Sequence, residues 1–215
     1  MIVVAWCGFL LAPGAALAGT LDQQQATDTS TAKTVSIAQG VAQTFTAGVT
    51  GNLDQVDLKL SRNGTPTVDL GVEIRDVSGG QPGNRILAGT LVPPASVPAT
   101  AQFVPVTMDP QAPVVTGGQY AIVLYSFAGS AVNDYAWFFA RLPAGDPYQG
   151  GGLFSTASPP SGPWFDEQAD AAFKTYVVPS TPPATGQPAA PLKKCKRKHG
   201  AKRKHCRKRA KRLPV

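Results

Sequence analysis

The central part of the chain, residues 19–192, contains no histidine and no cysteine. Both histidines and two of the three cysteines follow residue 192, and the third cysteine lies near the start. The central part therefore has no imidazole general base and no thiolate nucleophile, and it has no G-x-S-x-G motif for a nucleophilic serine. These absences exclude the common nucleophilic hydrolases, and we expect a protein that is not an enzyme.

Charged residues and helical periodicity are also scarce. Only 15% of the residues are charged, whereas 22 are Gly and 20 are Pro. No long stretch after residue 18 repeats its apolar residues with the 3.6-residue period of a helix. Frequent Val, Thr and turn residues instead predict an all-β domain. It would have about 150 residues, an ordinary size for a single hydrophobic core.

The net charge of +7 is unevenly distributed. Residues 193–215 contain thirteen Lys or Arg and no acidic residue. The other 7 of the 20 basic residues and all 13 acidic residues precede this tail, which gives the rest of the chain a net charge of −6. An acidic body joined to a cationic tail is expected to have two kinds of partner.

The first 18 residues, MIVVAWCGFLLAPGAALA, form an apolar segment that ends in Ala16-Leu17-Ala18. Signal peptidase accepts small residues at this spacing, so residues 1–18 predict a secretory signal peptide that is cleaved before Gly19. The protein would then be secreted or located at the cell surface. A membrane anchor is the alternative, but a segment of this length that includes Pro13 and Gly14 makes a poor spanning helix.

Short alternating segments fill residues 19–179. Two runs with a period of two, residues 56–60 and 68–74, are joined by Asn63-Gly64-Thr65-Pro66, which predicts a β-hairpin with one buried face. Val41–Ala47 is expected to be a strand with Phe45 inward. The nearly continuous apolar run of Gln119–Ser126 predicts a central strand buried on both sides. Further strands are expected at residues 34–37, 86–91, 102–108, 134–141 and 171–178. About eight to ten short strands at this spacing are typical of a sandwich or barrel.

The order of these segments resembles a known family. AQTFTAG is followed by GNLDQVDLKLSR, VEIRDVSGGQPGNRIL, PVVTGGQYAIVL, YAWF, a YQGGG loop and DAAFKTYVV. Over about Leu21–Pro179 this resembles the secreted bacterial domains of the choice-of-anchor R family. The resemblance implies an antiparallel β-sandwich of jelly-roll type in residues 19–179, found outside the cell beside varied anchoring segments. It implies no catalytic residues.

Three aromatic side chains are candidate ligand-binding residues: Tyr135, Tyr148 and Trp164. Many sugar-binding modules stack pyranose rings on exposed aromatic side chains of a sandwich. Packing in the core is the alternative. It is favoured for Trp137, whose strand is apolar on both faces, and it stays open for Trp164, which follows a Gly/Pro loop.

Asp166, Glu167 and Asp170 lie close together before the last expected strand. Carboxylates at the rim of a sandwich can bind a structural calcium ion, and no other cofactor is expected. Two carboxylates at a suitable separation also suffice for a glycoside hydrolase. Clustered acids in a loop are most often simply solvated.

After the sandwich, residues 180–192 form a Pro-rich linker, expected to be extended. The following tail, residues 193–215, is expected to be disordered and resembles the Cys-containing, Lys/Arg-rich termini of actinobacterial surface proteins. Its basic residues are expected to bind anionic polymers or lipids of the cell envelope through counterion release. Specific binding to nucleic acid is not expected, because the tail has no aromatic residue for base stacking. The basic residues are Lys193, Lys194, Lys196, Arg197, Lys198, Lys202, Arg203, Lys204, Arg207, Lys208, Arg209, Lys211 and Arg212.

The tail also holds Cys195 and Cys206, which can form a disulfide in an oxidising compartment. Together with His199 and His205 they offer the ligand types of a zinc site. The surrounding positive charges oppose a dication, which favours the disulfide.

The sequence thus favours an exported, non-catalytic module that its tail holds at the cell envelope, with carbohydrate as a candidate ligand. A purely architectural surface or matrix protein is the alternative. A secreted glycoside hydrolase acting through the acidic cluster is disfavoured by the lack of any nucleophile motif. One sandwich architecture serves many functions, so the fold alone does not decide among them.

Overall fold

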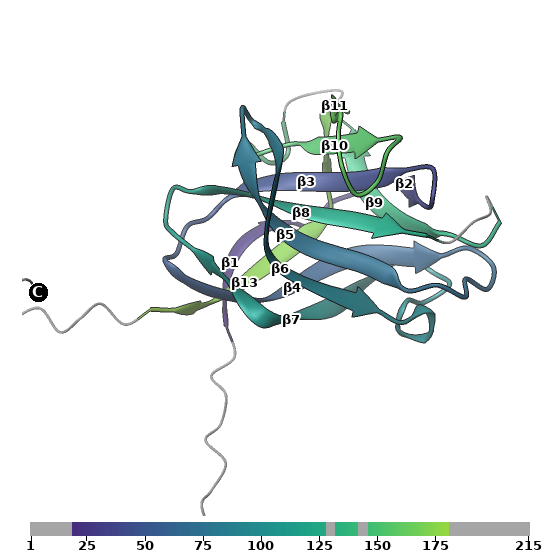
Figure 1. Cartoon of the computed structure of the whole chain (residues 1–215), viewed down its shortest axis with the longest axis horizontal. Coiled ribbons are helices and arrows are strands. Elements are labelled where there is room, and N and C mark those ends of the chain that lie inside the picture. Colours follow the sequence, from purple (N-terminus) through teal and green to yellow (C-terminus); the bar gives the residue numbers. More distant parts are fainter. Residues whose placement is uncertain (1–18, 128–131, 142–145, 181–215) are drawn as a thin grey trace, which may run out of the picture. The chain divides into compact units, whose positions relative to one another are not determined.

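The structure, a computed structural model, describes residues 19–127, 132–141 and 146–180. These residues form thirteen β-strands and one short 3-10 helix, η1 (Pro94–Ser96), and the strands build two antiparallel sheets (Figure 1). The predicted class, an all-β antiparallel sandwich, is confirmed. Within the described ranges, no helix is long and apolar enough to cross a membrane.

The seven-stranded sheet is organised around β4 (Gly51–Arg62). One edge of β4 pairs with β7, and the other pairs first with β13 and then, at Leu60–Arg62, with β9. Strand β1 continues the sheet beyond β13, while β2 and β12 pair with β9. The bounds of these strands are β1 (Thr20–Gln25), β2 (Thr31–Val35), β7 (Gln102–Val114), β9 (Tyr135–Arg141), β12 (Ala169–Ala171) and β13 (Phe173–Pro179).

The six-stranded sheet has the order β11-β10-β3-β8-β5-β6. Its central strand, β8 (Gln119–Ser126), pairs with β3 and β5, and its residues 121–124 are fully buried. The prediction of a central strand over these residues is confirmed. The other strands are β3 (Gly40–Thr46), β5 (Leu70–Ser78), β6 (Gln81–Val92), β10 (Leu153–Thr156) and β11 (Phe165–Asp166).

The predicted hairpin across residues 63–66 is wrong. Strand β4 belongs to the seven-stranded sheet and β5 to the six-stranded sheet, so this segment crosses between the sheets. Asn63 is held there by Asp134, because its Nδ2 donates a hydrogen bond to the Asp134 carboxylate (2.6 Å). The hairpin that does form joins β5 to β6 through Gly79 and Gly80. Their φ angles of 60° and 79° fit a type I′ turn, which favours glycine at both central positions.

The core between the sheets contains the apolar side chains of β4 and β9 on one side and of β3, β5 and β8 on the other. Phe45 is fully buried, as predicted, and its ring packs against those of Tyr120 and Phe173. Trp137 is also fully buried, and its indole N–H donates to the Ala172 carbonyl (3.0 Å). The expectation that Trp137 belongs to the core is confirmed.

Candidate functional site

A second, smaller apolar cluster lies on the outer face of the six-stranded sheet. Ala42, Ala121, Val123 and Phe154 form it together with Trp164, and Val77 packs against it. Trp164 comes from residues 157–164, the segment between β10 and β11 that we call the strap. Because the indole packs on this cluster, Trp164 is only 6% exposed. The strap therefore covers part of a sheet face that would otherwise meet solvent.

A buried ion pair also holds the strap. Side chains alternate along β5. Because Val72 and Ile74 point into the core, Glu73 and Arg75 point to the outer face of the sheet. The Arg75 guanidinium pairs with Glu73 through two nitrogens, with Nε donating to Oε2 at 2.6 Å. Its Nη1 donates to the backbone carbonyl of Pro160 in the strap (2.9 Å). Arg75 and Glu73 are 3% and 8% exposed. Removing either partner would leave a buried charge without compensation.

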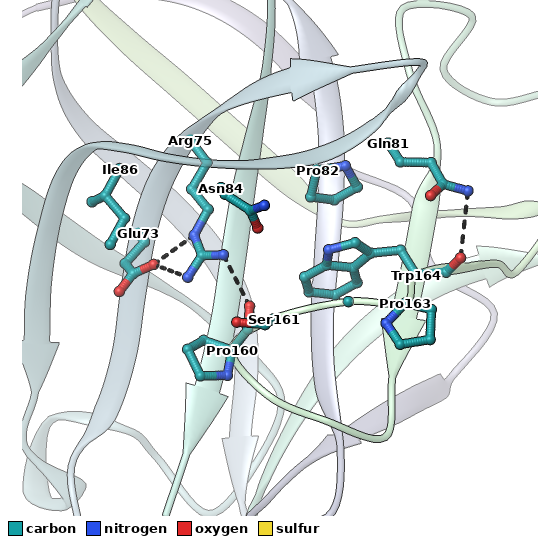
Figure 2. Close-up of a pocket in the computed structure, with 11 residues that line it drawn as sticks. Glu73, Arg75, Gln81, Pro82, Asn84, Ile86, Pro160, Ser161, Pro163 and Trp164 are labelled. Atoms are coloured by element: carbon teal, nitrogen blue, oxygen red, sulfur yellow. Dashed lines mark hydrogen bonds and ion pairs between the residues drawn. The ribbon is translucent and has the colours of Figure 1, made fainter.

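Between the strap and the β5–β6 hairpin lies a groove of about 740 Å³ (Figure 2). The hairpin contributes Gln81, Pro82, Asn84 and Ile86, and the strap contributes residues 160–164. Gln81 joins the two sides, because its Nε2 donates to the Trp164 carbonyl (3.4 Å). Among the described residues, the amide of the exposed Asn84 has no hydrogen-bond partner. This amide is thus free to bind a ligand.

The groove is electrically balanced. Glu73 and Arg75 are the charged residues that line it, and they pair with each other. Because these two charges compensate each other, the site suits a neutral ligand better than an ion.

Tyr135 and Tyr148 do not form an exposed platform, so this part of the sequence prediction is wrong. Tyr135 is fully buried in the core, and its hydroxyl donates to the Val68 carbonyl (2.6 Å). Tyr148 is 9% exposed and packs edge-on against Phe173, and its hydroxyl donates to Gln23 (3.0 Å). Burial raises the pKa of both tyrosines to about 12. Neither ring can stack on a sugar.

Trp164 packs on the outer-face cluster and also borders the groove. It is too buried to be an open platform for a pyranose ring, so of the two alternatives that the sequence leaves open the structure shows core packing. It nevertheless lines the groove, and its indole lies between Pro82 and the strap in Figure 2. Trp164 is thus part of the core cluster beneath the strap and part of the groove wall.

The three acidic residues suggested for calcium do not converge on one point. Glu167 accepts a hydrogen bond from Ser155 (2.5 Å) and pairs with Lys33 (2.7 Å) and Arg141 (3.4 Å). Burial alone would raise the pKa of Glu167, but the hydrogen bonds from Lys33 and Ser155 and the nearby positive charges lower it overall. Within the described ranges, no three His, Cys, Asp or Glu side chains are placed to hold a metal ion.

Asp166 and Asp170 instead share a small cavity of about 170 Å³ with Asp146. Asp170 is 2% exposed and accepts hydrogen bonds from Gln43 Nε2 (3.0 Å) and the Tyr148 backbone N–H (3.3 Å). Burial, together with the negative charge of Asp146, raises the pKa of Asp170 to about 7. Its two oxygens are already occupied, which fits a structural role at the junction of the two sheets.

Sequence reasoning missed the residues that line the groove apart from Trp164. The alternation in VEIRDV indicates that Glu73 and Arg75 share one face, but not that a segment about eighty residues later covers them. The predicted signal peptide, the linker after Ser180, the tail cysteines and the thirteen basic residues lie outside the described residues.

No protein-family model and no curated protein matches the chain. The resemblance to the choice-of-anchor R family therefore stays a prediction.

Proposed function

We propose that the protein is an exported, non-catalytic β-sandwich module that binds a neutral carbohydrate in the groove between the strap and the β5–β6 hairpin. The observation that carries this proposal is the groove's lining. It brings together an indole, two side-chain amides and a charge-balanced Arg–Glu pair.

The chemistry of a sugar matches this lining. A saccharide presents hydroxyl groups that donate and accept hydrogen bonds, and the amides of Gln81 and Asn84 can do both. It also presents apolar C–H surface, which can pack against the 54% exposed Ile86 at the side of the groove. A volume of about 740 Å³ lies within the range of small-molecule sites.

The rigidity of the groove also favours binding. Arg75 ties the strap to β5, and Gln81 ties it to the hairpin, so both walls are fixed before a ligand arrives. A preformed site spends less of its binding free energy on ordering its own side chains. This partly offsets the weak hydrogen bonding that sugars achieve in competition with water.

The tail adds a second attachment in this proposal. Thirteen basic residues within residues 193–215 bind anionic envelope polymers or lipids through counterion release. Retention by the tail would keep the groove close to surface glycans and raise their effective concentration.

The test is a glycan array probed with the chain Gly19–Val215 in about 0.5 M salt, which screens binding by the tail. We expect selective binding to neutral oligosaccharides. Asn84→Ala should weaken it at least tenfold, about 1.4 kcal/mol. The control is Gln111→Ala, an exposed residue of β7 in the other sheet, which should leave binding unchanged. Both variants should keep the wild-type melting temperature because both side chains are exposed.

Two results would contradict the proposal. Absence of any binding in high salt would leave the sandwich as an architectural module and the tail as its attachment. Binding that Asn84→Ala and Gln111→Ala leave equally intact would place the ligand elsewhere on the surface.

A further inference from the structure

Asp54 occupies an irregular position near the start of β4. Its neighbours Leu53 and Gln55 have partners on both β7 and β13, but Asp54 has none in either register. An extra residue of this kind is a β-bulge, and bulges commonly redirect a side chain. The Asp54 carboxylate is directed to Gly19, the residue just before β1.

The contact with Gly19 satisfies only one of the two carboxylate oxygens. The Gly19 backbone N–H donates to Asp54 Oδ2 at 2.9 Å. Oδ1 is buried and accepts no hydrogen bond from any described residue. Buried carboxylate oxygens without a donor are rare in folded proteins, and each one calls for an explanation.

The space around Gly19 is closed to any larger residue. A Cβ atom at this position would lie 2.2 Å from Asp54 Oδ1 and 2.9 Å from the backbone nitrogen of Val177. The unpaired oxygen therefore lies directly against the backbone of residue 19, whose nitrogen already donates to the other oxygen of the same carboxylate.

As long as Ala18 is attached, that nitrogen carries a single hydrogen and no charge. Hydrolysis of the Ala18–Gly19 bond consumes one water, leaves a carboxylate on Ala18 and turns the Gly19 nitrogen into an α-ammonium with three N–H donors. One of these can keep the bond to Oδ2 while a second reaches Oδ1. A charged donor facing a carboxylate also makes a stronger hydrogen bond than an amide does.

We propose that the chain is processed between Ala18 and Gly19, and that the new α-ammonium of Gly19 forms an ion pair with Asp54 that fixes β1 to the seven-stranded sheet. The inference rests on the export that the proposed function includes. The small residues Ala16 and Ala18 supply a cleavage context independently of the Asp54 geometry. The ion pair can form only after cleavage, so the mature chain is more stable than its precursor.

The test compares the chain Gly19–Val215 with a free α-amino group and the same chain acetylated on Gly19. Acetylation keeps one N–H and removes the charge, as the intact peptide bond does. We expect the free form to melt at least about 3 °C higher. In Asp54→Asn this difference should disappear. In the control Asp57→Asn, which removes another carboxylate of β4, it should remain.

A second variant keeps Asp54 and so tests the ion pair even if Asp54→Asn fails to fold. One Ser added before Gly19 moves the amino group by one residue, and acetylation should then have no effect on melting. Mass spectrometry of the exported protein should also find Gly19 as its first residue.

Equal melting of the free and acetylated Gly19 chains would overturn the ion pair, and a different N-terminus on the exported protein would overturn the processing. Neither result bears on sugar binding, because Asp54 and the groove belong to different sheets. Loss of sugar binding would in turn leave the melting comparison intact.

Discussion

Replacing Trp164 by alanine should destabilise the sandwich even though the residue borders a groove. The indole is 94% buried on the cluster formed by β3, β8 and β10. Truncating a buried Trp to Ala typically costs about 3–5 kcal/mol of unfolding free energy. Water can enter the vacated space from the groove, so we expect the lower end, about 3 kcal/mol. In a domain of this size that corresponds to a fall in melting temperature of about 6–12 °C.

The matched control is Phe165→Ala. Phe165 is the next residue, is also aromatic and is 60% exposed, so its removal should change the unfolding free energy by about 0.5 kcal/mol or less. Both variants are compared with wild type by thermal unfolding followed by circular dichroism. Trp164→Phe, which keeps a ring on the cluster, should fall between wild type and Trp164→Ala. If Trp164→Ala melts as Phe165→Ala does, the strap is not anchored by the indole and the reasoning about the outer-face cluster fails.

Two further predictions concern the acidic cavity and the tail. The folded pKa of Asp170, about 7, exceeds its ordinary value of 3.8, so the folded chain binds more protons than the unfolded chain between these pH values. The unfolding free energy should therefore carry a component that falls as pH rises from about 4 to about 7, and Asp170→Asn should remove it. Urea denaturation at several pH values measures this, and identical pH profiles would contradict it. Deleting residues 193–215 should release the protein from the cell surface to the medium, and about 0.5 M salt should elute the intact form. Unchanged fractionation of the truncated protein would show that the tail is not the attachment.

The strands with a strong apolar pattern were predictable from the sequence. Gln119–Ser126 is strand β8 with the predicted bounds, and Phe45 and Trp137 are in the core. Strand β1 was not predicted, because its residues are polar and it is an edge strand held by backbone pairing with β13. Strand β7 continues through Pro110 to Val114, beyond the predicted end at Met108. It pairs only with β4 in the described ranges, and an edge strand tolerates proline.

The partner of a strand was harder to predict than its buried face. Alternation in residues 56–60 and 70–74 correctly indicates one core-facing side for each segment, whereas Val68, expected on the same side, is 37% exposed and precedes β5. Alternation contains no information on whether the next strand pairs beside the first or crosses to the opposite sheet, because both arrangements bury the same residues. Asn63 and Gly64 have the composition of a hairpin turn but serve a crossover, which Asp134 stabilises from a distant part of the chain.

The groove depends on such distant contacts throughout. From the sequence, Glu73 and Arg75 could be assigned to one outward face of their strand. Trp164 could be assigned either to the core or to a ligand-binding site. Only the fold brings residues 73–86 and 160–164 together, since the Arg75 contact to Pro160 spans 85 positions of the sequence.

The turn at Gly79 and Gly80 has a consequence for how this protein can diversify. A Cβ atom at either glycine would meet nothing within 4 Å, so the tip of the β5–β6 hairpin projects freely beside one wall of the groove. Residues inserted at this tip would lengthen the wall without touching the packing between the sheets. The hairpin is thus a place where relatives, or laboratory libraries, can vary loop length and acquire new ligands on an unchanged scaffold.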